Sequence, residues 1–133
     1  MVRLLRAEPG HDVVSEISSQ ASERATSVIT YAESRSAIAR SAGVASETRR
    51  GRTALDALWP QLTRVTADEA LALEAGALAE RHRLRGMDAL HLASALRYAA
   101  GVAPQIVVFA SWDRDQRAAA RAEGLELLPA RLG

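Results

Sequence analysis

Four carboxylates stand at positions where an α/β protein gathers its chemistry. Glu33 follows a short apolar run by one helical turn, Asp88 opens an amphipathic segment, and Asp113 and Asp115 follow a second apolar run. Their oxygens are hard ligands that suit Mg²⁺ or Mn²⁺, ions that keep several waters and share substrate phosphates. If the fold brings these side chains together, they predict a metal site for phosphate chemistry.

Each acid also has a structural explanation. Asp88 and Asp113 are natural helix N-caps, Asp115 suits the positive end of a helix dipole, and Glu33 fits a solvated face. Taken singly, such residues are more often structural than catalytic, and their spacing does not decide. His91, one turn after Asp88, is interpreted either as a general base or as a buried structural histidine.

Strands and helices alternate along the chain. Short strands are predicted over residues 25–30, 62–66, 105–110 and 125–128. Helices are predicted over residues 1–7, 12–20, 31–41, 46–62, 69–84, 88–100 and 113–123, with Ser46, Asp68 and Asp113 as N-caps. This alternation predicts right-handed crossovers and a mostly parallel sheet covered on both faces. In such sheets ligands bind outside the carboxyl ends of the strands, where the acids are expected.

Length and composition indicate one ordinary domain. The chain has 133 residues, of which 48% are hydrophobic, and a formal net charge of +1. The absence of cysteine excludes disulfides and thiolate zinc sites and fits a reducing, cytoplasmic environment. The longest uncharged run, residues 98–112, is shorter than the roughly 20 residues of a membrane span. We therefore expect no membrane segment and no signal peptide.

Three segments carry the acids in the order and spacing of a known family. Residues 28–40 (VITYAESRSAIAR), 84–96 (LRGMDALHLASAL) and 109–125 (FASWDRDQRAAARAEGL) resemble the acidic motifs of PIN-domain ribonucleases, above all the VapC toxins of bacterial toxin/antitoxin pairs. The EPG turn at residues 8–10 is similar to the family's first bend between helices. The resemblance implies a three-layer α/β/α fold over a single domain, residues 1–133, and a Mg²⁺- or Mn²⁺-dependent endoribonuclease.

The resemblance also assigns roles and partners. By motif position Glu33, Asp88 and Asp113 become the catalytic metal-site acids, and Asp115 resembles an auxiliary acid of some members. The implied partners are an RNA substrate, a VapB-like antitoxin and a second copy of the chain in a homodimer. Candidate RNA contacts are three arginines at helical spacing, although a solvated face with intrahelical pairs is favoured slightly when the cluster is taken alone: Arg114, Arg117 and Arg121.

One departure from the family pattern matters for activity. Family members begin with a hydrophobic strand that ends in Asp, whereas residues 2–10 (VRLLRAEPG) resemble the helix that follows it. The sequence therefore predicts that the first central strand and the first metal-site Asp are missing from this chain. Either the natural start lies upstream of Met1, or the domain is N-terminally truncated relative to the family and its cleavage is impaired. The alternative is an inactive PIN-like module that binds an antitoxin or itself, and a magnesium titration separates the two.

Overall fold

A parallel sheet forms the centre of the molecule. The computed structural model describes residues 2–4, 23–41 and 43–131. Within them the sheet has the strand order β3-β2-β1-β4-β5, and all its pairings are parallel. The strands are β1 (Val2–Leu4), β2 (Glu23–Ser27), β3 (Thr63–Val65), β4 (Val107–Ala110) and β5 (Glu126–Leu128). The predicted parallel α/β architecture is confirmed.

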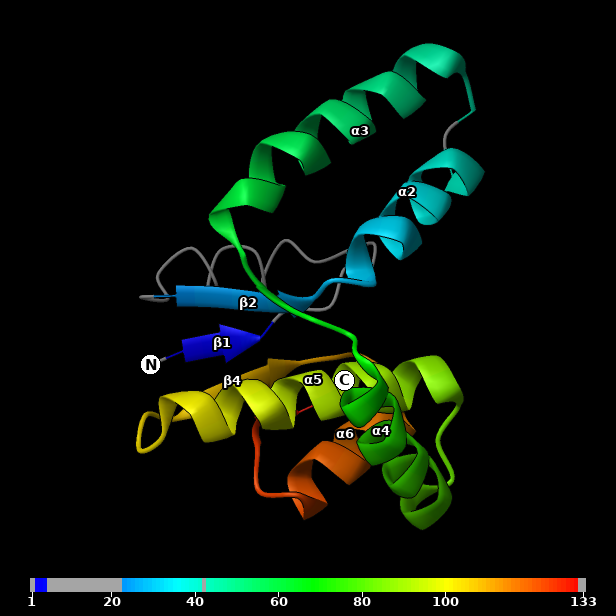
Figure 1. The fold of residues 1–133 in the computed structure, drawn as a ribbon. Coiled ribbons are helices and arrows are strands. Elements are labelled where there is room, and N and C mark those ends of the chain that lie inside the picture. Colours follow the sequence, from blue (N-terminus) through cyan, green and yellow to red (C-terminus); the bar gives the residue numbers. More distant parts are fainter. Residues whose placement is uncertain (1, 5–22, 42, 132–133) are drawn as a thin grey trace.

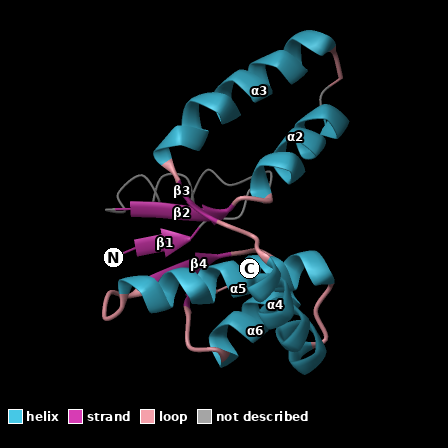
Figure 2. Ribbon diagram, in the orientation of Figure 1, coloured by secondary structure: helices cyan, strands magenta, loops and turns pink. Residues whose placement is uncertain are grey.

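The helices lie on the two sides of this sheet. Figure 1 shows α4, α5 and α6 together on one side, whereas α2 and α3 lie on the other. The bounds are α2 (Thr30–Ser41), α3 (Ala45–Leu58), α4 (Glu69–His82), α5 (Gly86–Val102) and α6 (Arg114–Ala122), with a short 3₁₀ turn at Trp59–Gln61. Figure 2 shows the strands between the two groups of helices. The connection from β2 to β3 runs across the sheet in one direction, and those from β3 to β4 and from β4 to β5 run in the other. Right-handed crossovers therefore predict helices on opposite faces, as observed.

The core lies between the sheet and α5. Leu92 on α5 and Phe109 on β4 are fully buried, and the small side chains of Ala89 and Ala93 let α5 approach the strands. These α5 residues belong to one stripe at three- and four-residue spacing, as the sequence predicts. Burial of this stripe fixes α5 on the sheet, with its first turn at the carboxyl ends of the strands.

Residues 2–4 correct one expectation. The sequence predicts the end of a helix at residues 1–7 and a missing central strand, but Val2–Leu4 pairs with β2 on one side and with β4 on the other. Without β1 the inner edges of β2 and β4 would present unpaired N–H and C=O groups, which are costly when buried. The predicted turn at residues 8–10 and helix at residues 12–20 lie outside the described residues.

The α2–α3 hairpin stands away from the sheet (Figure 1). No residue of α3 is buried. A Cβ atom added at Gly51 would lie 2.7 Å from Ile38 Cγ2, so glycine permits the close approach of the two helices. At the base of the hairpin the Tyr31 hydroxyl donates to Asp56 Oδ1 at 2.6 Å. The hairpin is therefore held by contacts between its own two helices.

Within the part of the chain that the structure describes, none of the helices has the length and apolar character that a membrane span needs.

Candidate active site

Three of the predicted acids lie at the carboxyl end of the sheet. Glu33 is in the first turn of α2, which follows β2, and Asp113 caps the helix that follows β4. Asp88 is in the first turn of α5, which runs antiparallel to β4 and so begins at the same end (Figure 1). The strand order reverses between β1 and β4, and such a reversal is where open α/β sheets bind ligands.

Asp88 and Asp113 line one pocket. Its volume is about 930 Å³, and it lies between α4, the start of α5 and the loop before α6. Asp88 is buried, whereas Asp113 is exposed. Beside the acids stand Arg85, Met87 and Trp112, and the wall formed by α4 consists of small side chains: Ala72, Ala75, Gly76 and Ala79. The structure thus brings together two of the predicted acids in a cavity with an apolar wall.

Asp113 is confirmed as the N-cap of α6. Its Oδ1 accepts a hydrogen bond of 2.8 Å from the backbone N–H of Gln116. Its own backbone N–H donates to Ser111 Oγ at 3.1 Å. These two contacts fix the carboxylate at the first turn of α6, where the positive end of the helix dipole favours a nearby phosphate.

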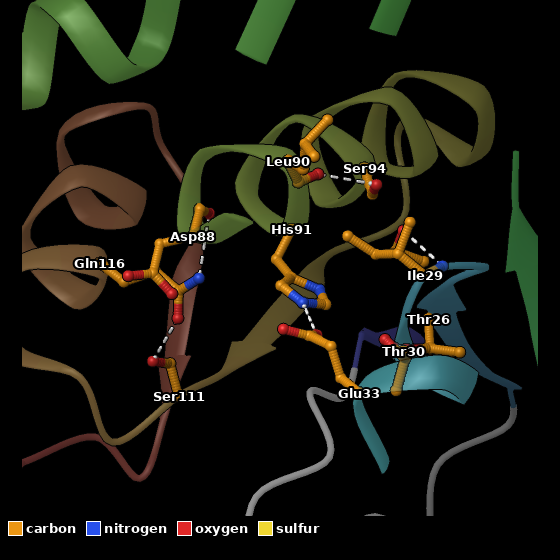
Figure 3. A network of polar contacts seen from close by, with 11 residues as sticks. Thr26, Ile29, Thr30, Glu33, Asp88, Leu90, His91, Ser94, Ser111 and Gln116 are labelled. Carbon is orange, nitrogen blue, oxygen red and sulfur yellow. Dashed lines mark hydrogen bonds and ion pairs between the residues drawn. The ribbon is translucent and has the colours of Figure 1, made fainter. Parts of the chain in front are cut away.

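Glu33 is held by His91. The carboxylate Oε1 of Glu33 contacts His91 Nε2, in an ion pair when the ring is protonated (Figure 3). The His91 side chain is 3% exposed and that of Glu33 is 31% exposed. His91 lies one helical turn after Asp88 on α5, so the pair ties the first turn of α2 to the helix that carries Asp88. Of the two interpretations of His91, its burial and its contact with Glu33 fit the structural one.

Gln116, which the sequence analysis did not single out, joins α6 to α5. Its Nε2 donates to the backbone carbonyl of Asp88 at 3.1 Å, and its Oε1 accepts from Ser111 Oγ at 2.7 Å (Figure 3). Gln116 is fully buried. One signal was available: Gln116 lies at helical spacing from Ala119 and Ala120, so a polar side chain falls on the apolar face of α6.

The three arginines of α6 do not share one exposed face. Arg114 and Arg121 are exposed, but Arg117 is 5% exposed and donates from Nη1 to the backbone carbonyl of Ser111 at 2.9 Å. Arg117 is buried because it lies beside Gln116 on the face that α6 turns to the core. Burial lowers the pKa of its guanidinium. Contact of Arg114 and Arg121 with RNA stays a prediction.

The four predicted acids do not gather into one group. Among the described residues, no three side chains of His, Cys, Asp or Glu are placed to hold a metal ion together. Glu33 is held against His91, and Asp115, in the first turn of α6, does not line the pocket. The remaining pair, Asp88 and Asp113, still fits Mg²⁺, which proteins usually bind through one or two carboxylates while it keeps its waters.

Comparisons with known proteins cover nearly the whole chain. The PIN domain family model matches residues 1–128. Two curated relatives from Mycobacterium tuberculosis, Ribonuclease VapC45 of strain CDC 1551 and Ribonuclease VapC49 of strain H37Rv, are each 33% identical over 135 residues, which is 98% of this chain and 91% of the relative.

Solved structures resemble the fold over the same extent. The crystal structure of FitAcB from Neisseria gonorrhoeae gives a TM-score of 0.62 at 20% identity and covers 96% of both chains. FitAB bound to an IR36 DNA fragment gives a TM-score of 0.65 at 19% identity and covers 100% of this chain and 98% of the other. At this identity the two structures are evidence about the fold alone. They agree with the layered architecture expected from the sequence.

Proposed function

The chain belongs to the PIN-domain family, with VapC ribonucleases as its curated relatives, and from that premise we propose that it is a cytoplasmic, metal-dependent endoribonuclease. The observation that carries this proposal is the placement of Asp88 and Asp113 in one pocket beside the strand reversal. Two carboxylates in a cavity at the carboxyl end of a parallel sheet suit a divalent ion that shares its remaining ligands with a phosphate.

The residues at and beside the pocket have different proposed roles in hydrolysis. Asp88 and Asp113 would hold Mg²⁺ or Mn²⁺, and such an ion, when bound, supplies an acidified water and neutralises charge on the phosphate. Arg85, at the pocket and directly before α5, offers a guanidinium to the RNA backbone. The exposed amides at the start of α5 and α6 favour the same anion. His91 keeps Glu33 beside this end of α5.

The expected products follow from in-line attack. The oxygen of water forms a bond to phosphorus, the bond from phosphorus to the 3′-oxygen breaks, and the leaving oxygen takes up a proton. One strand then ends in a 3′-hydroxyl and the other begins with a 5′-phosphate. Because Asp88 and Asp113 are the predicted acids that line the pocket, we expect weaker metal binding and slower cleavage than in a four-acid site.

Cleavage of a single-stranded RNA in Mg²⁺ tests the proposal. Asp88→Asn removes one charged ligand and should lower the rate at least 100-fold, because the ion is then held by fewer charges. Asp68→Asn is the matched control, since Asp68 caps α4 and pairs with Arg97 outside the pocket. Equal rates in wild type and Asp88→Asn, or full activity in chelator, would contradict the proposal.

We propose in addition that the chain binds a VapB-like antitoxin and pairs with a second copy of itself. Two observations favour a protein partner: the fold resembles chains of the FitAcB and FitAB structures, and the pocket is flanked by exposed Met87 and Trp112. Calorimetric titration with Mg²⁺ separates the enzyme from a purely interacting module, because only the enzyme needs an ion at Asp88 and Asp113. Light scattering on the isolated chain tests the homodimer.

A further inference from the structure

A buried amide connects the two segments that carry the acids of the pocket. Asp88 belongs to the first turn of α5, and Asp113 belongs to the loop between β4 and α6. Gln116 contacts both segments and is 0% exposed. We propose that Gln116 is a positioning residue that sets the two acids relative to each other, an inference that rests on the proposed function.

The side chain of Gln116 bonds to a backbone carbonyl on one side and to a serine hydroxyl on the other. On the α5 side, its Nε2 donates to the Asp88 carbonyl at 3.1 Å. On the loop side, its Oε1 accepts from Ser111 Oγ at 2.7 Å. The Ser111 Oγ in turn accepts a hydrogen bond of 3.1 Å from the backbone N–H of Asp113. Figure 3 shows Gln116 between Asp88 and Ser111. The side chain thus joins the loop before α6 to Asp88, which lies 28 residues before Gln116 in sequence.

Gln116 also forms a direct hydrogen bond with Asp113. The backbone N–H of Gln116 donates to Asp113 Oδ1 at 2.8 Å. With its own N–H bound to Ser111 and one carboxylate oxygen bound to Gln116, Asp113 is held at both its backbone and its side chain. Because a carboxylate is planar, fixing one oxygen and the backbone restricts where the second oxygen points. Gln116 therefore controls the direction of one acid and the distance to the element that carries the other.

Burial makes this arrangement stiff. Ser111 is 1% exposed and Arg117, which donates to the Ser111 carbonyl, is 5% exposed, so the network has little access to water. A buried polar group that loses its partner has no solvent to replace it, so the network favours a single arrangement. Outer groups of this kind typically change metal affinity by about 10- to 100-fold when they are removed.

The test replaces Gln116 by an apolar side chain of similar length. Gln116→Met keeps the volume and the backbone N–H but loses both side-chain hydrogen bonds. We expect amide hydrogen exchange to speed up together in residues 86–90 and 111–115, and Mg²⁺ affinity measured by calorimetry to fall about tenfold. The exchange measurement needs no metal and no activity.

Ser94→Ala is the matched control. Ser94 is fully buried on α5 and donates to the Leu90 carbonyl at 2.8 Å, so its loss also removes a buried side-chain hydrogen bond. It should lower the unfolding midpoint but leave Mg²⁺ affinity within twofold of wild type. Unchanged exchange in Gln116→Met, or equal Mg²⁺ affinity in Gln116→Met and Ser94→Ala, would overturn the inference.

The outcomes also separate this inference from the proposed function. If wild type binds no Mg²⁺, the proposed metal chemistry fails, and the positioning role is then decided by hydrogen exchange alone. If wild type binds Mg²⁺ and Gln116→Met binds it equally well, the proposed chemistry stands and Gln116 is only a packing residue.

Discussion

Asp113 combines two roles that sequence reasoning treats as alternatives. One carboxylate oxygen of Asp113 caps α6 by accepting the backbone N–H of Gln116, and the same side chain lines the pocket together with Asp88. A cap explains why an acid occurs at that position, but it does not remove the acid from chemistry, because a carboxylate has two oxygens. A structural role as a cap is therefore compatible with a place at the pocket, and the catalytic role of Asp113 stays a prediction.

The contact between Glu33 and His91 is expected to stabilise the fold. His91→Phe fills the same space without a nitrogen and leaves the Glu33 carboxylate beside an apolar ring, so the free energy of unfolding should fall by about 2 kcal/mol. Urea denaturation measures the change. The RNA cleavage rate should fall with it, since α2 is then less firmly tied to α5.

A double-mutant cycle isolates the pair. Glu33→Gln, His91→Phe and the combined variant should give a coupling energy of about 1 kcal/mol or more, because the two side chains touch. Strictly additive effects would mean that the contact contributes nothing to stability.

At the scale of elements, the carboxylate of Glu123, at the end of α6, forms hydrogen bonds with side chains at the end of α4. Glu123 Oε2 accepts from His82 Nε2 at 2.8 Å and from Arg81 Nη1 at 2.9 Å. The hydrogen bond from His82, followed by that from Arg81, lowers the pKa of Glu123, against the effect of burial. The folded state therefore favours the charged form of Glu123.

This shift predicts a pH-dependent stability. A lowered pKa contributes free energy of unfolding above the unfolded-state pKa of Glu, and the contribution is lost as the pH falls through the lower folded-state pKa. Glu123→Gln should thus cost about 1 kcal/mol at pH 7, and the difference from wild type should disappear towards pH 3. Urea denaturation across this range measures it, and a difference independent of pH would contradict the assignment.

Local signals predicted most elements and some of their ends. Asp68 was predicted to cap α4, and its Oδ1 accepts the Leu71 amide at 2.8 Å. Ser46 was predicted to cap α3. That helix instead begins at Ala45, and its N-cap residue Val44 makes no side-chain hydrogen bond. There the Glu47 carboxylate accepts the Gly43 N–H at 3.1 Å. The boundary is set by this contact around the hairpin tip, which a search for a Ser cap does not consider.

At the scale of the whole molecule, the central strand could not be predicted from its own residues. The run Val-Arg-Leu at residues 2–4 is short and has a charge in the middle, so no local period distinguishes strand from helix. It becomes a strand because β2 and β4, distant in sequence, present parallel edges to it. The site follows the same rule: the sequence supplies the acids, but topology decides that Asp88 and Asp113 share a pocket while Glu33 meets His91.

Breaking β1 should therefore affect the entire domain. Arg3→Pro constrains the backbone and removes an N–H at the middle of the central strand, where proline is not tolerated, and should lower the free energy of unfolding by about 3 kcal/mol or more. Arg3→Ala keeps the peptide N–H and is the control. Thermal unfolding followed by circular dichroism measures both. Equal midpoints for the two variants would place residues 2–4 outside the sheet.

The hairpin of α2 and α3 has an evolutionary consequence. Because α3 buries no residue, substitutions on its outward face should each cost only about 0.5 kcal/mol or less, and selection for folding constrains that face weakly. Related chains are then free to diverge there while the sheet and its pocket stay constant.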